Sequence, residues 1–126
     1  MRELIDKLKE FNTMFNVPTT PLNELDYLSQ CKLRFDLMKE ENKEYYDAVL
    51  DNDKVEIADA LTDQLYVLCG TILYHGLEDK IIPLFNEVHD SNMSKLEDGK
   101  PIFRSDGKVM KGKDYFKPNI NKILNE

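Results

Sequence analysis

Two long amphipathic segments joined by a very short turn constrain the fold of this chain more than any other feature. An apolar period of 3.6 residues predicts one helix from about residue 23 to 50 and another from about 54 to 75. Only Asp51-Asn52-Asp53 separates them, so the two helices are predicted to lie antiparallel. Asn23 is the expected N-cap of the first helix, and either Asp51 or Asp53 is the expected cap of the second.

Acidic side chains interrupt the apolar stripe of both predicted helices. Glu41 and Glu44 fall on the stripe that Leu33 and Leu37 begin. The second helix carries three acids in line with its later apolar residues, namely Glu56, Asp59 and Asp63. Carboxylates in line with a core are costly unless positive charge lies between them. Acidic oxygens suit Mg²⁺ or Mn²⁺, so the pattern predicts a divalent metal site.

The antiparallel pairing brings the two acidic sets to comparable depths, because helix residues rise by about 1.5 Å each. Four carboxylates are therefore predicted to converge into an oxygen cage that stays open to water and phosphate, namely Glu41, Glu44, Glu56 and Asp59. Glu40 and Asp63 are expected near its rim, orienting a water or holding a second ion. The alternative is chance, because a chain with 24 acids must contain some solvated pairs at helical spacing. Asp47, Asp51 and Asp53 are interpreted as such solvated or capping groups.

The rest of the chain predicts an all-α protein with a four-helix-bundle-type core over residues 1–94 and an irregular tail. Further helices are expected over residues 2–16 and 77–93, with Pro83 kinking the last helix or marking a later start. Their inward residues are expected to be Leu4, Ile5, Leu8, Phe11 and Phe15, and Leu77, Ile81, Leu84, Phe85 and Val88. Ser105-Asp106-Gly107 predicts a small hairpin between residues 102–104 and 108–110. Residues 1–126 are expected to form one domain, with residues 95–126 packing on the core or on a partner subunit.

Charge and cysteine usage exclude several classes of protein. The net charge is −7, which argues against binding to a nucleic-acid polymer. Residues 95–126 are nevertheless basic, with eight Lys/Arg against five Asp/Glu. A basic tail beside an acidic metal cleft suits an anionic ligand, although the charge taken alone favours simple solubility. No apolar run suggests a membrane span or a signal peptide. Cys31 and Cys69 are expected to be reduced thiols of a cytoplasmic protein.

Two motifs resemble those of a known superfamily. Glu40-Glu41-Asn42-Lys43-Glu44 followed by Glu56-Ile57-Ala58-Asp59 resembles the EExxE…ExxD signature of the MazG-like, all-α nucleoside triphosphate pyrophosphohydrolases. That superfamily includes phosphoribosyl-ATP pyrophosphohydrolase, the MazG proteins and dimeric dUTPases. Residues 88–95 (VHDSNMSK) and the DGKP and DGKVMKG segments after them resemble its phosphoribosyl-ATP-pyrophosphohydrolase-like subgroup. The resemblance covers about residues 23–118.

The resemblance implies roles for individual side chains. Mg²⁺, or Mn²⁺ in its place, would be bound by Glu41, Glu44, Glu56 and Asp59, and either Glu40 or Glu41 would activate the water. Substrate would be bound by Asn92, Lys95, Lys111, Tyr115 and Asp63, with Lys95 on the triphosphate. The alternative for Lys95 and Lys111 is solvated surface, and His75 and His89 are expected to be ordinary helix-end and helix-surface residues. The fold of the superfamily implies a homodimer or a homotetramer.

The implied activity is Mg²⁺-dependent hydrolysis of a ribo- or deoxyribonucleoside triphosphate to the monophosphate and pyrophosphate, as part of cleaning the nucleotide pool. One alternative is phosphoribosyl-ATP pyrophosphohydrolase of histidine biosynthesis. The additional basic tail after Ser94 favours the first activity over this one. An alternative of another class is a non-catalytic helical interaction module, whose acids would only keep it soluble.

Overall fold

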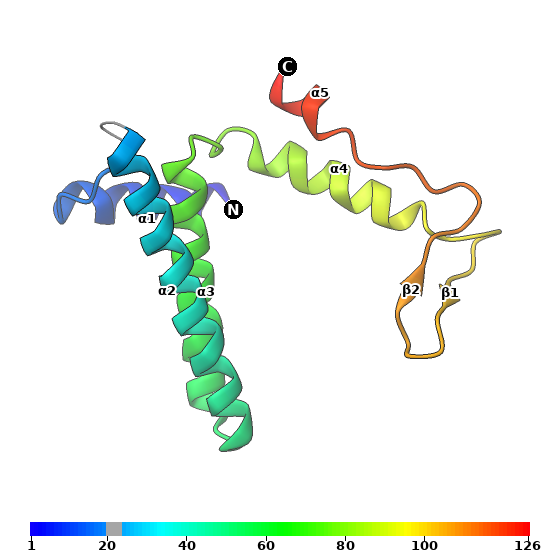
Figure 1. Cartoon of the computed structure of the whole chain (residues 1–126), viewed down its shortest axis with the longest axis horizontal. Helices are drawn as coiled ribbons and strands as arrows, with labels where there is room; N and C mark the ends of the chain where they lie inside the picture. Colours follow the sequence, from blue (N-terminus) through cyan, green and yellow to red (C-terminus); the bar gives the residue numbers. More distant parts are fainter. Residues whose placement is uncertain (20–23) are drawn as a thin grey trace. The chain divides into compact units, whose positions relative to one another are not determined.

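The computed structural model describes residues 1–19 and 24–126, and most of them are helical, so the predicted all-α class is confirmed. The expected N-cap Asn23 lies outside the described residues. The chain divides into two compact units, Met1–Glu78 and Asp79–Glu126. The first contains three of the four predicted helices and the second contains the fourth helix and the tail (Figure 1). That residues 1–126 form a single domain stays a prediction.

The first unit is built around the predicted helical hairpin. Helix α2 (Glu24–Leu50) and helix α3 (Lys54–Tyr74) run antiparallel and side by side (Figure 1). Of the two candidate caps, Asp53 is the one that acts, because its side chain accepts a hydrogen bond of 3.1 Å from the backbone N–H of Glu56. Asn52 turns the chain with a φ of 51°, a left-handed conformation that asparagine tolerates well.

The core of the first unit lies at the end of the hairpin away from the turn. Helix α1 (Arg2–Met14) packs on α3 there. The buried apolar side chains of the unit are Ile5, Leu8, Ala48, Ala60, Cys69, Ile72, Leu73 and Tyr74. Phe11 and Phe15 depart from the predicted inward stripe, since they are 38% and 67% exposed and stack on each other at 4.6 Å. Both cysteines are free, as predicted.

Apolar side chains also stay exposed on the outside of the hairpin. Nine of them on α2 and α3 are between 39% and 61% exposed, namely Tyr27, Leu33, Phe35, Tyr46, Val49, Leu61, Leu65, Tyr66 and Leu68. This is more apolar surface than a solvated hairpin needs, and it leaves room for a partner surface. None of the described helices is both long and apolar enough to cross a membrane.

The second unit begins with helix α4 (Ile81–Met93), which starts four residues later than residue 77, the predicted start. Pro83 explains the later start, because a proline without an N–H fits the first turn of a helix but not its interior. Strands β1 (Ile102–Phe103) and β2 (Val109–Met110) pair antiparallel, as predicted. Helix α5 (Ile120–Leu124) was not predicted, because five residues are too few to show a helical period.

The tail packs along α4 within this unit. The hydroxyl of Ser91, 2% exposed, donates to the backbone carbonyl of Phe116 at 2.8 Å. The N–H of Phe116 in turn donates to the Ser94 hydroxyl at 3.1 Å. The N–H of Asn119 donates to the Glu87 carboxylate at 3.0 Å. On α4 itself, Phe85 and Val88 were expected to face inward but are 68% and 40% exposed.

Candidate functional site

The register of the hairpin decides which acids meet. Glu41 lies eleven residues before Asn52, and Asp63 lies eleven residues after it, so these two carboxylates face each other across the helix pair. A cross-helix hydrogen bond agrees with this register, because Gln64 Nε2 donates to Asn42 Oδ1 at 3.2 Å. The side chains that approach each other are therefore those at nearly equal distances from the turn.

Three carboxylates form a compact cluster between the helices. Glu41, Glu44 and Asp63 each offer an oxygen, and these atoms lie within 4.8 Å of one another. Glu41 and Asp63 are half-buried, whereas Glu44 is exposed. The Oε2 atom of Glu41 is buried, and no hydrogen-bond partner for it exists among the described residues. A buried carboxylate oxygen without a partner is costly, and a cation or a proton would remove that cost.

The electrostatics of the cluster agree with this conclusion. Burial, the hydrogen bond with Glu44 and repulsion from Glu44, Asp63 and Glu40 raise the pKa of Glu41 to about 7. The pKa of Asp63 is raised as well, by burial and then by repulsion from Asp59 and Glu44. Each cause destabilises the negatively charged form of these carboxylates. A cation placed between them would stabilise that form. The donor set is all oxygen, which fits Mg²⁺ or Mn²⁺.

The cluster contains a different α3 residue from those predicted for the cage. Glu41 and Glu44 meet as predicted, but Asp63, expected at the rim, takes the place that was given to Glu56 and Asp59. The reason is the register, since the residue that faces Glu44 at equal distance from the turn is Ala60. Counting outward from Asn52 along both helices would have identified Asp63 from the sequence.

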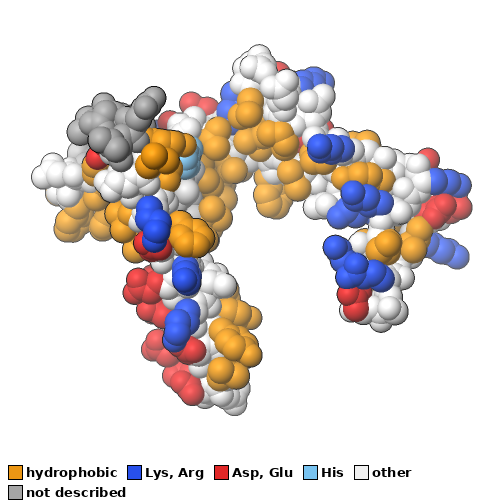
Figure 2. Space-filling model, in the orientation of Figure 1, with side chains coloured by type: hydrophobic (Ala, Val, Ile, Leu, Met, Phe, Trp, Pro, Cys, Tyr) orange, Lys and Arg blue, Asp and Glu red, His pale blue; other side chains and the backbone are white. Residues whose placement is uncertain are grey.

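An acidic hollow adjoins the cluster on the side of the turn. It has a volume of about 220 Å³ and is lined by Glu44, Asp47, Ala48, Asp51, Asp53, Glu56, Asp59 and Ala60. The two alanines are buried, and their small side chains leave the space that the acids line. Glu44 belongs to both the cluster and the hollow, so the acidic surface is continuous. Acidic side chains gather along one edge of this half of the hairpin (Figure 2).

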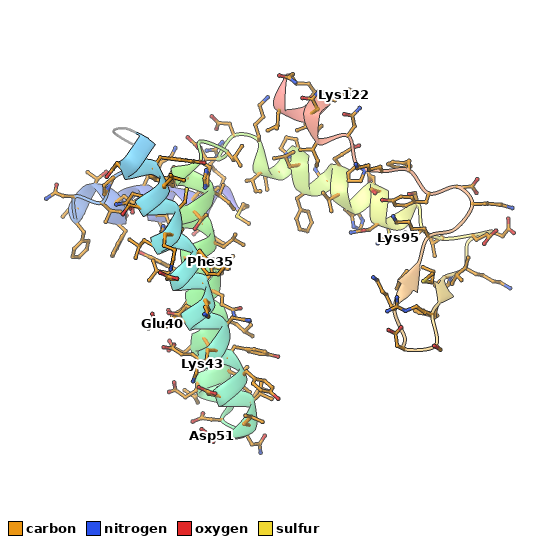
Figure 3. The ribbon with its side chains drawn as sticks, in the orientation of Figure 1. Phe35, Glu40, Lys43, Asp51, Lys95 and Lys122 are labelled. Carbon is orange, nitrogen blue, oxygen red and sulfur yellow. The ribbon has the colours of Figure 1, made fainter. Side chains whose placement is uncertain are left out.

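The other acids on this surface have separate partners or positions. Lys43 Nζ lies 2.7 Å from the Asp47 carboxylate, an exposed ion pair of the solvated kind that was predicted for Asp47. Glu40 is exposed and lies outside the three-carboxylate cluster, although its charge contributes to the raised pKa of Glu41. Glu40 and Lys43 follow one another along α2, and Asp51 lies beyond the end of the helix in the turn (Figure 3).

The remaining predicted substrate residues all belong to the second unit. The backbone N–H of Lys95 donates to the carbonyl of Asn92 at 3.2 Å, so these two residues lie together at the end of α4. Lys95 is half-buried and Asn92 is exposed. The other two predicted substrate residues also lie together, because Lys111 Nζ is 4.7 Å from the centroid of the Tyr115 ring, a cation–π contact. Their roles in binding substrate stay predictions.

The two histidines lie where they were expected. His75 is the C-cap residue of α3, and its Nε2 lies 3.9 Å from Cys31 Sγ. His89 is exposed on α4. Neither belongs to the carboxylate cluster.

Comparison with known proteins bears directly on this surface. The sequence model of the family described as phosphoribosyl-ATP pyrophosphohydrolase (PRA-PH) matches residues 8–92. The matched region contains α2, α3, the three-carboxylate cluster and the acidic hollow. No curated protein matches the chain.

Proposed function

The chain belongs to the phosphoribosyl-ATP pyrophosphohydrolase family and is a hydrolase of nucleotide phosphoanhydride bonds, and from this we propose that it is a Mg²⁺-dependent nucleoside triphosphate pyrophosphohydrolase. It would cleave a ribo- or deoxyribonucleoside triphosphate to the monophosphate and pyrophosphate, as a nucleotide-pool cleaning enzyme. The observation that carries the proposal is the cluster of Glu41, Glu44 and Asp63, with its buried unpartnered oxygen, beside an acidic hollow.

The proposed metal ligands are Glu41, Glu44 and Asp63, with Glu56 and Asp59 next in line along the hollow. A divalent ion held there would neutralise phosphate oxygens, polarise the phosphorus and acidify the attacking water. The same carboxylate ligands also suit Mn²⁺. Because all the charged side chains that line the hollow are carboxylates, a triphosphate alone would be repelled.

Glu40 is proposed as the residue that accepts the proton from the attacking water, with Glu41 as the alternative. Glu40 is adjacent to the cluster but exposed and outside it, so its oxygens are free for a proton. A general base of this kind contributes about 10²–10⁴-fold to the rate. From the family resemblance, Lys95 would neutralise the leaving pyrophosphate, and Asn92, Lys111 and Tyr115 would contact substrate.

Phosphoribosyl-ATP is the second candidate substrate, and the family match itself favours it. The tail favours the broader activity instead. The match ends at residue 92, while the basic segment with its hairpin and α5 continues to residue 126 and packs along α4. A distinct segment attached to a shared catalytic unit is the expected place for a difference in substrate.

The test is release of pyrophosphate in the presence of Mg²⁺ from the common ribo- and deoxyribonucleoside triphosphates, dUTP and phosphoribosyl-ATP. We expect release from at least one nucleoside triphosphate and a loss of about 100-fold or more in Glu41→Gln. Asp36→Asn is the matched control, because Asp36 is an exposed acid of the same helix, paired with Lys32 at 2.7 Å. Folded protein that releases pyrophosphate only from phosphoribosyl-ATP would replace the proposal with the second candidate.

A second measurement separates an enzyme from a helical interaction module. Binding of Mg²⁺ or Mn²⁺ relieves repulsion within the cluster, and a ligand at 100 times its Kd stabilises a fold by about 2.7 kcal/mol. We expect the Tm to rise with either ion in the native protein and in Asp36→Asn, and to stay constant in Asp63→Asn. If neither ion changes the Tm of the native protein, the result contradicts the metal site and favours the interaction module.

A further inference from the structure

Arg34 lies in line with the carboxylate cluster at the other end of the hairpin. It precedes Glu41 by seven residues, which places it on the same face of α2 about two turns away. Its guanidinium lies over Gly70, which follows Asp63 by seven residues on α3. A Cβ atom at Gly70 would be only 2.6 Å from Nη1 of Arg34, so the glycine is what admits the guanidinium between the helices.

Among the residues that the structure describes, the guanidinium of Arg34 has no anionic partner. The side chain is half-buried, and burial lowers its pKa without an opposing acid. Over residues 1–19 and 24–126, no carboxylate or carbonyl oxygen accepts a hydrogen bond from it. Two lysines of the same helix differ from it, because Lys32 and Lys43 are exposed and each lies 2.7 Å from a carboxylate. An unpaired and partly desolvated charge is costly, and an anionic ligand removes that cost.

The spacing suits a ligand that reaches from the cluster to the arginine. Seven helical residues span about 10 Å. A cation bound at the cluster, together with a chain of phosphates, is long enough to reach from the cluster to Arg34. The planar fork of an arginine donates two parallel hydrogen bonds to one phosphoryl group, which fixes its direction as well as its charge. The acidic hollow lies on the opposite side of the cluster, where a phosphate would meet only carboxylates.

We propose that Arg34 binds the terminal phosphoryl group of the nucleotide, the one that leaves as the far end of pyrophosphate. This assignment rests on the proposed pyrophosphohydrolase activity and adds a residue of the first unit to it. Arg34 then orients the triphosphate along the hairpin, with the scissile bond nearer the cluster. It also stabilises the negative charge that develops on the leaving group.

The test is calorimetric binding of inorganic pyrophosphate, and separately of the nucleoside monophosphate product, at saturating Mg²⁺. In Arg34→Gln we expect the Kd for pyrophosphate to rise about tenfold or more, the loss typical of a charge-assisted hydrogen-bonded pair. The Kd for the monophosphate is expected to stay within about twofold, because that product carries no terminal phosphoryl group from the leaving side. Lys32→Gln removes the same charge two residues away and is expected to leave both constants unchanged.

Two further variants keep the test decisive if Arg34→Gln fails to fold. Arg34→Lys keeps the charge and loses the fork, and Gly70→Ala keeps the arginine but displaces its guanidinium. Each is expected to weaken pyrophosphate binding and to spare the monophosphate. Unchanged pyrophosphate affinity in folded Arg34→Gln or Arg34→Lys overturns the assignment, as does an equal loss for both products. Native protein that hydrolyses no nucleotide overturns the proposed function, whereas an active enzyme with the Arg34 variants unaffected overturns only this inference.

Discussion

Glu41 lies where the sequence argument places it, half-buried and beside Glu44, and its role as a metal ligand stays a prediction. Its position on an apolar stripe was enough to predict a ligand, because a half-buried carboxylate needs a partner. Asp63 shows where that argument stops. Periodicity along one helix places it on the right face, but only the register between two helices brings it against Glu41. Arg34 was missed for the same reason, since its significance depends on the glycine opposite.

The raised pKa of Glu41 predicts an unusual pH dependence for the metal-free protein. The pKa is about 7 in the folded state against an ordinary value of 4.5, so the folded state holds an additional proton between these values. The contribution to stability is therefore complete below about pH 4.5 and is lost as the pH rises through about 7. We expect urea unfolding in EDTA to show this loss in the native protein and not in Glu41→Gln. An equal pH dependence in both proteins would contradict the assignment.

At the level of the elements, the hairpin was predictable almost to the residue and the second unit less so. The ends of α2 and α3 follow from Asp51-Asn52-Asp53 and from the stop at Gly76, whose φ of 70° is one that glycine adopts without strain. The later start of α4 depends on how one proline is accommodated, for which the sequence allowed two outcomes. Helix α5 depends on the Asn119 cap, whose side chain accepts from the Lys122 N–H at 3.1 Å, and five residues carry no period.

The cap at Asp53 gives a prediction about α3. Asp53→Ala removes the acceptor of the Glu56 N–H, and we expect the free energy of unfolding to fall by about 1 kcal/mol. Asp51→Ala is the matched control, because Asp51 lines the same hollow and loses the same charge without capping the helix. Urea unfolding of both variants in EDTA measures the difference. Equal stability of the two variants would show that charge relief, and not the cap, dominates at this turn.

Across the whole molecule, exposed apolar side chains occur in both units. Phe35 on α2 is 61% exposed and Phe85 on α4 is 68% exposed. Aromatic side chains so exposed at helical positions favour an interface, because each would remove a large apolar area from water. With the oligomers implied by the family resemblance, they support the proposal that the chain acts as a homodimer or homotetramer.

Sedimentation equilibrium tests this proposal. We expect a mass of at least twice the 14.7 kDa of one chain, and a shift towards the monomer in Phe35→Glu and Phe85→Glu, because a carboxylate buried in an apolar interface is costly. Lys32→Glu on the same helix is the control, because Lys32 is exposed and pairs with Asp36 in solvent. A native protein that sediments as a single chain at micromolar concentration would contradict the proposal.

The turn at Asn52 has a consequence for how this chain can vary in length. Exposed loops ordinarily accept insertions and deletions, because they carry few contacts. By contrast, a residue added within α3 between the turn and Asp63 would rotate the later part of α3 by about 100° relative to α2 and slide it by about 1.5 Å. Asp63 would then leave Glu41, and Gly70 would leave Arg34, in a single event. The number of helical residues between the turn and Asp63 therefore sets the geometry of the whole site, and a change in that number is more damaging than most changes in the identity of those residues.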